Sequence, residues 1–174
     1  MTSFEQIISS WHDFYIMVGT AAATLIGLLF VSLSLNADAI TRKENTILRL
    51  LAAQSFASFI SVLMFAVLFL IPDQSPNGLG LPLLFIDLIG IVMLARRLRQ
   101  TYQNRALAWS RGGILLRFAI PLASFLTLLI IAIDVLLGNA FDLYWLVPVM
   151  ILLILDASLN AWNLLLKLRD SNQG

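Results

Sequence analysis

Five runs of apolar residues, each long enough to cross a lipid bilayer, constrain this chain more than any other feature of its sequence. The hydrocarbon core of a membrane is about 30 Å thick and needs roughly 20 apolar residues of helix. The runs cover about residues 11–35, 47–71, 79–98, 114–137 and 141–166. Of all residues, 60% are hydrophobic and 12% are charged, about half the charged fraction of a soluble domain. The sequence therefore predicts an all-α polytopic membrane bundle of five transmembrane helices, forming one domain over residues 1–174.

Prolines and glycines indicate where these helices end. The second run stops at Pro72, because proline cannot continue the hydrogen-bond ladder of a helix. We expect Pro82 in the first turn of the third helix, where a missing N–H costs little. A turn at 138–139 separates the last two runs. Pro121 and Pro148 are each expected to be able to kink a span.

The segment before the first run has a helical spacing of apolar residues. Phe4, Ile7, Ile8 and Trp11 lie at i, i+3, i+4 and i+7, which is typical of a short amphipathic helix in the membrane interface. A frayed lead-in is the alternative interpretation. The segment holds no basic residue before Trp11, so we expect it to be retained rather than cleaved as a signal peptide.

The distribution of Lys and Arg predicts an orientation with the N-terminus outside and the C-terminus inside, since basic residues remain cytoplasmic. The basic residues follow the first run, the third run and the fifth run: Arg42, Lys43 and Arg49; Arg96, Arg97, Arg99, Arg105 and Arg111; Lys167 and Arg169. The other side carries the acids Glu5, Asp13, Asp73 and Asp142. The basic connection from Arg96 to Arg111 is first a determinant of topology and second a surface for anionic lipid or a cytoplasmic partner. The net charge of +1 gives no indication of a nucleic-acid partner.

Small residues recur at every fourth position in the first two runs. Such residues allow membrane helices to approach closely. They are Gly19, Ala23 and Gly27 in the first run, and Ala53, Ala57 and Ser61 in the second. Packing within the chain is the favoured interpretation, and packing against a second copy is the alternative.

The first span also carries a resemblance. The string WHDFYIMVGTAAATLIGLLFVSLSLN, the Ile71-Pro72 pair and the Asn160-Ala161-Trp162 end of the last span resemble a group of small multispanning bacterial inner-membrane proteins without an assigned function. The resemblance implies a location in the bacterial cytoplasmic membrane. It implies no catalytic or binding residue.

The last span carries polar residues along one face. Asp156, Asn160, Asn163 and Lys167 follow one another at helical spacing, and they run from the expected midplane to the cytoplasmic end. Arg117 in the fourth span is expected roughly 6 Å from Asp156 in depth, so the two residues are predicted to pair. This pair is either a lock between two helices or part of an ion or proton relay with Asp156 as the titrating group.

Other ionisable residues are expected at different depths. Asp87 either accepts a hydrogen bond from a serine of the second span or lines the outer half of a path toward Asp156. The two carboxylates are expected to differ in depth by roughly 7–8 Å, too far to share a proton. Asp134 is expected to reach the lipid headgroups. The single histidine, His12, is interpreted as an interfacial anchor, with an external pH sensor as the alternative.

No pattern in the chain indicates an enzyme, a metal site or a cofactor. The chain has no Cys, and it contains no nucleophile motif, no set of metal ligands and no phosphate-binding loop. Two classes remain. The favoured one is a self-associating bundle with an ion or proton path along Asp87, Asp156, Asn160 and Asn163. The alternative is an accessory subunit that docks a larger membrane complex through its small residues.

Overall fold

The structure is a computed structural model that describes residues 4–41, 45–103, 111–139 and 141–171, with side chains except at 5, 39, 46, 47, 100–103, 111–117, 141, 142 and 169–171. Every element in these ranges is helical: α1 (Phe4–Ser10), α2 (His12–Leu35), α3 (Ala37–Thr41), α4 (Thr46–Phe69), α5 (Pro76–Gln103), α6 (Arg111–Leu136), the 3-10 helix η1 (Phe141–Trp145) and α7 (Leu146–Ser171). Five of them, α2, α4, α5, α6 and α7, are long and apolar enough to cross a membrane. This confirms the prediction of an all-helical fold with five helices that could span a membrane.

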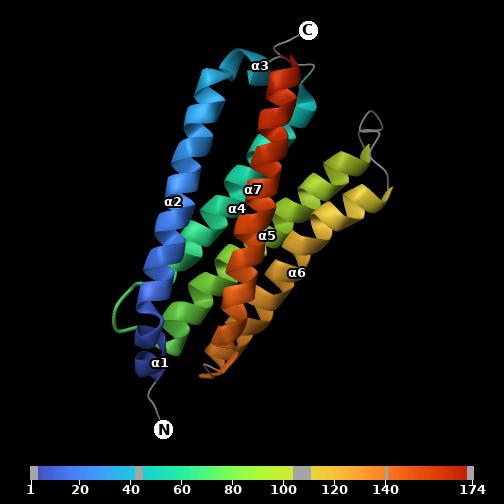
Figure 1. Ribbon diagram of the computed structural model, residues 1–174. Coiled ribbons are helices and arrows are strands. Elements are labelled where there is room, and N and C mark those ends of the chain that lie inside the picture. The colour runs from blue at the N-terminus through green and yellow to red at the C-terminus, as the bar shows by residue number, and fades with distance from the viewer. Residues whose placement is uncertain (1–3, 42–44, 104–110, 140, 172–174) are drawn as a thin grey trace.

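The five long helices form two groups (Figure 1). Helices α2, α4 and α7 pack together, with α4 in contact with both of the others, and α5 packs along α6 as an antiparallel hairpin. The hairpin leans away from α2 and α7 toward the end of the bundle at which α3 and the C-terminus lie. We call this end, where Arg96, Arg97, Arg99 and Lys167 lie, the basic end. The other is called the opposite end.

The turn between α4 and α5 is shorter than expected because side chains cap both helices. Helix α4 ends at Phe69, two residues early, and the Gln74 side-chain amide donates to the carbonyl of Leu68. Helix α5 begins at Pro76 after an N-cap, since the N–H of Gly78 donates to Ser75 Oγ at 3.1 Å. Pro82 consequently lies inside the helix. The sequence had predicted it in the first turn, and that prediction is wrong.

The connection between α6 and α7 contains the predicted turn. Gly138 has a φ of 81°, a left-handed conformation that glycine adopts without strain. Asn139 Nδ2 donates to Asp134 Oδ1 at 3.0 Å and helps to close the helix end. Since α7 begins at Leu146, Pro148 is only its third residue and breaks no intrahelical bond. The predicted kink at Pro148 is therefore wrong, whereas Pro121 does lie inside α6.

The N-terminal segment is a packed helix. Ile8 is buried, and Phe4 and Ile7 pack against the same hydrophobic cluster. The Trp11 ring meets Tyr144 edge to face, with centroids 4.8 Å apart. Residues 4–10 are therefore helical and docked on the bundle, which agrees with the predicted amphipathic helix and not with a frayed lead-in.

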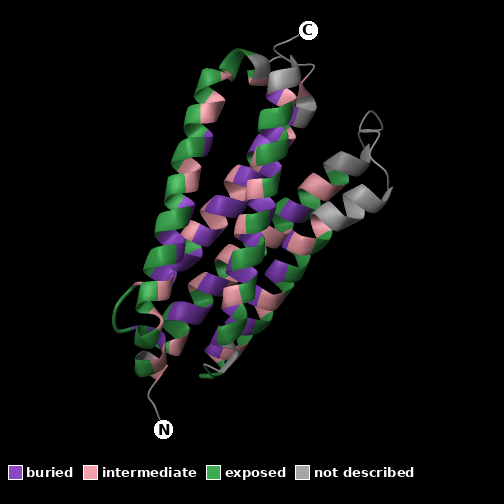
Figure 2. Ribbon diagram, viewed as in Figure 1, coloured by how far each residue is buried: buried purple, intermediate pink, exposed green. Residues whose placement is uncertain are grey.

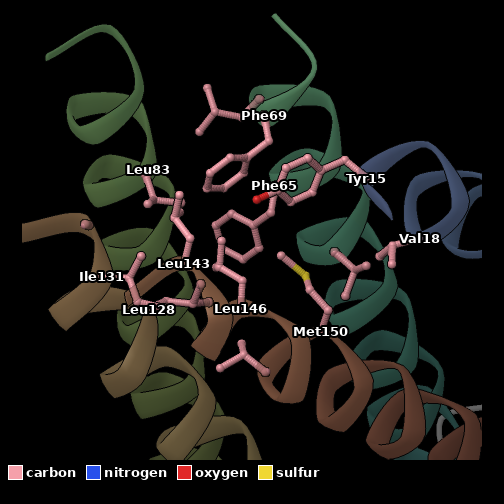
Figure 3. Packing of buried hydrophobic residues seen from close by; sticks show 14 of the residues in the cluster. Tyr15, Val18, Phe65, Phe69, Leu83, Leu128, Ile131, Leu143, Leu146 and Met150 are labelled. Atoms are coloured by element: carbon pink, nitrogen blue, oxygen red, sulfur yellow. The ribbon is translucent and has the colours of Figure 1, made fainter. Parts of the chain in front are cut away.

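Two hydrophobic clusters fill the bundle. The larger cluster lies toward the opposite end and takes residues from α1, from all five long helices and from η1. Figure 3 shows Phe65 and Phe69 of α4 between Tyr15 and Leu143, and the Tyr15 and Phe69 rings stack with centroids 4.6 Å apart. The buried members of the smaller cluster come from α2, α4 and α7, and none of its described members belongs to α5 or α6. Figure 2 shows the buried residues between the helices and exposed residues along their outer faces, as a lipid-facing bundle requires.

Glycine holds α5 close to α6. A Cβ added at Gly80 would lie 2.7 Å from Leu136 Cγ, and one added at Gly90 would lie 2.5 Å from Phe125 Cε1. Both distances are too short for real carbon atoms, so these positions require the absence of a side chain. The small-residue pattern of the sequence did not include either glycine.

We predict that Gly90→Ala lowers the thermal unfolding midpoint of the detergent-solubilised protein, because forcing a methyl group against Phe125 costs about 1–3 kcal/mol. Gly27→Ala is the matched control, since nothing lies within 4 Å of a Cβ at that position and alanine favours helix. Its midpoint should stay equal or rise. Circular dichroism at 222 nm measures both, and equal midpoints for the two variants would contradict the close α5 and α6 contact.

Candidate functional site

Polar side chains are buried at one depth in the bundle. Of the eight buried polar side chains among the described residues, seven lie in the middle of the long helices: Gln54, Ser55 and Ser58 on α4, Asp87 on α5, Ser124 on α6, and Asp156 and Asn160 on α7. Counted along each helix from the opposite end, they lie roughly 15–23 Å deep at 1.5 Å per residue. This depth corresponds to the middle of a bilayer core about 30 Å thick. We call these seven residues the polar layer.

Asp87 is the most unusual member of the polar layer. Its side chain is 0% exposed, and neither carboxylate oxygen has a hydrogen-bond partner among the described residues. It follows Gly80 by about two turns and precedes Gly90 by about one turn, so it lies on the face of α5 that packs against α6. The hydrogen bond that the sequence predicted from a serine of α4 is not formed.

Asp156 and Asn160 form a pair on α7. Asn160 Nδ2 donates to Asp156 Oδ2 at 3.2 Å, and the two side chains are 3–5% exposed. Asn163 is exposed and Lys167 is half-buried. The predicted polar stripe therefore divides into an inner pair and an outward-facing Asn163.

Counted along their helices, the two buried carboxylates lie closer to one level than the sequence predicts. Asp87 lies eleven residues after Pro76, and Asp156 lies ten residues after Leu146. Along their helices the two residues are therefore within about 2 Å of the same depth. The difference from 7–8 Å arises because capping by Ser75 starts α5 early, while η1 delays the start of α7.

The predicted pair of Asp156 and Arg117 involves the Arg117 side chain, which lies outside the described residues. The backbone of Arg117 belongs to α6. Two members of the basic connection, Arg105 and Arg111, also have side chains outside the described part of the chain. The described basic residues Arg96 and Arg99 are exposed, and Arg97 is half-buried.

Two serines of the polar layer, Ser55 and Ser124, differ from the hydroxyl residues Ser61 and Thr127 of the same two helices. The Ser61 hydroxyl donates to the Ala57 carbonyl at 2.8 Å, and Thr127 donates to Ala123 at 2.9 Å, the usual arrangement in a helix. Ser55 and Ser124 are buried and form no such bond within the described residues. The Nε2 atom of Gln54 is also buried without a described partner. The layer thus keeps donors and acceptors that its own helices do not satisfy.

The small residues predicted for helix packing occupy three kinds of position: against a neighbouring helix, on an exposed face, and along a groove. Gly19 lies against α4, with an added Cβ 3.0 Å from Ala66 Cβ. Ala23 and Gly27 lie on an exposed face of α2. On α4, Ala53 is exposed, whereas Ala57 and Ser61 are half-buried and line a groove beside α5.

The remaining ionisable candidates lie near the opposite end. His12 and Asp13 are exposed at the start of α2, and Asp134 is half-buried and bonded to Asn139. The described residues contain no group of three or more His, Cys, Asp and Glu side chains that could hold a metal ion.

The sequence did not predict a role for Ser55 and Ser124, because single serines in apolar helices carry no pattern that reports their burial.

No protein-family model matches the chain, and neither curated proteins nor solved structures yield a similar protein.

We predict that removing the two buried carboxylates one at a time has different effects on stability. Asp156→Ala leaves the Asn160 amide without its carboxylate acceptor and should cost about 1–3 kcal/mol. Asp87→Ala removes a group with no described partner, so the thermal midpoint should stay equal or rise. Thermal unfolding in one detergent compares them, and a larger loss for Asp87→Ala than for Asp156→Ala would contradict the described surroundings of Asp87.

Proposed function

We propose that this chain is a non-enzymatic membrane protein whose polar layer forms the central part of a proton or cation path. The observation that carries the proposal is the enclosed carboxyl group of Asp87, which lies mid-span without a hydrogen-bond partner among the described residues. An ionised carboxylate in a membrane interior is costly unless it is paired. Such a group is stabilised by binding a proton or a cation, and a group that binds and releases one is a step in a path.

The rest of the polar layer supports this proposal. Ser124 on α6 and Ser55 on α4 have hydroxyls without described partners, and hydroxyls can relay protons or coordinate cations. The Asp156 and Asn160 pair supplies a second carboxylate at a similar depth on α7. The larger hydrophobic cluster lies between this layer and the opposite end, so the conformation described corresponds to a closed path.

Flux measurements on purified protein in liposomes test the proposal. With a proton gradient and a pH-sensitive dye inside, the native protein should carry flux, and Asp87→Asn should reduce it to the leak of protein-free liposomes. Asp134→Asn is the matched control, because Asp134 lies near the opposite end and bonds Asn139. Its flux should remain native. Sodium and potassium gradients then distinguish a cation path from a proton path.

The absence of any gradient-driven flux in the native protein would contradict the proposal. So would an Asp87→Asn protein that retains the native circular dichroism spectrum and the native flux. We expect Asp156→Asn to reduce flux as well, since a relay through the layer uses both carboxylates.

We further propose that the basic end faces the cytoplasm, that the N-terminus lies outside, and that the membrane is the bacterial cytoplasmic membrane. The positive-inside rule and the resemblance of the first span support these assignments. The chain has no native Cys, so single cysteines report sidedness directly. Asn139→Cys should react with an impermeant maleimide in intact cells, and Arg99→Cys only after lysis. The reverse pattern would contradict the orientation.

An accessory subunit is the second candidate, and the exposed small residues of α2 favour it. Nothing lies within 4 Å of a Cβ at Gly27, and Ala23 is exposed on the same helix, so this face can receive another polypeptide helix closely. A second copy of the chain fits a path, whereas a different and larger membrane protein fits an accessory role. Purification in mild detergent distinguishes them: a homo-oligomer supports the first, and a single copy held in a larger complex supports the second.

A further inference from the structure

A groove lies where the α5 and α6 hairpin separates from α4. It has a volume of about 170 Å³ and is bounded by α4, α5 and the middle of α6. On the α4 side it extends from Gln54 to Met64, and on the α5 side from Arg97 to Ile86. The end residues of these stretches are ten and eleven positions apart, so the groove extends roughly 15 Å along the helices.

Small side chains hollow this groove. Ala57 and Ser61 of α4 form one wall, and Gly90 of α5 lies opposite them. Larger apolar side chains, including Met64, Ile86 and Ile89, surround the deeper part of the groove. The space is therefore narrow, apolar and elongated.

The groove changes in polarity along its length. Arg97 lies at its end toward the basic end of the bundle, and the exposed Arg96 and Arg99 flank it along α5. Gln54 and Ser58 line the adjacent part, while the deepest lining residues are apolar. Along the groove, a charged group, hydrogen-bonding groups and an apolar wall follow one another. The phosphate, the glycerol esters and an acyl chain of a phospholipid follow one another in the same order.

We propose that this groove is a binding site for an anionic phospholipid of the leaflet at the basic end. The guanidinium of Arg97 binds the phosphate, and its five N–H donors allow it to do so while it keeps other interactions. Gln54, the member of the polar layer furthest from the opposite end, lies on the glycerol side, and one acyl chain passes Ser58 into the space next to Ala57 and Ser61. Net negative charge on the lipid is required because the guanidinium of Arg97 lines this end of the groove. The groove shares Gln54 and Ser58 with the polar layer, but lipid binding is measured without flux, so its test is separate from that of the proposed path.

Lipid binding by the purified protein tests the site. Native mass spectrometry from detergent, with phosphatidylglycerol or phosphatidylcholine added at equal concentration, should show a one-lipid adduct that favours phosphatidylglycerol. Arg97→Gln should weaken phosphatidylglycerol binding about fivefold, as expected for one basic residue at a membrane surface. Arg99→Gln is the matched control, since Arg99 lies on the same helix end but does not line the groove. Its affinity should change by less than about twofold.

A second pair of variants tests the apolar part. Ala57→Leu fills the groove and should reduce binding of both lipids, whereas Ala53→Leu, one turn away and exposed, should leave both unchanged. Thermal midpoints establish that each variant is folded. If Ala57→Leu does not fold, the comparison of Arg97→Gln with Arg99→Gln still tests the proposal. Equal binding of the two lipids, equal effects of Arg97→Gln and Arg99→Gln, or an adduct with the mass of a fatty acid alone would overturn the proposal.

Discussion

The structure depends on one constraint, which is that a bilayer interior offers no water to hydrogen-bond with the backbone. Each long segment must therefore satisfy its own N–H and C=O groups as helix, and the unsatisfied groups remain only at helix ends. The short connection between α4 and α5 meets this requirement with side chains: Ser75 caps the start of one helix, and Gln74 bonds the end of the other. Among the described residues, the polar layer holds side-chain atoms that are buried without a hydrogen-bond partner.

Packing then determines where those side chains lie. Gly80 and Gly90 bring α5 so close to α6 that residues on the α6-facing side of α5 are enclosed. Asp87 is one of these residues, and it is buried as fully as Leu83 one turn before it. Helix α7 contrasts with α5, because Asn160 provides a local partner for Asp156. The two carboxylates thus occupy the same depth in different states of hydrogen bonding, and this difference makes Asp87 the centre of the proposed path.

The sequence predicts what depends on length, charge and local turn chemistry. The number of helices, the bounds of α2 and the turn at Gly138 follow from such signals. The early start of α5 was missed because Pro76 precedes Asn and Gly, which are typical of a turn, whereas the Ser75 cap makes the same residues a helix start. Which face of a helix meets a neighbour is not encoded in spacing, so Ala23 and Gly27 were expected at a helix contact but lie exposed. Gly80 and Gly90, which the spacing did not indicate, pack against α6. The depth of Asp87 changed with the helix start, although its presence within a span was predicted correctly.

The lean of the α5 and α6 hairpin sets the outline of the molecule. Because the hairpin meets the other helices near the opposite end and separates from them toward the basic end, the molecule has the outline of a wedge. If the five long helices cross a bilayer, such a wedge takes up a larger area in the leaflet at the basic end than in the other leaflet.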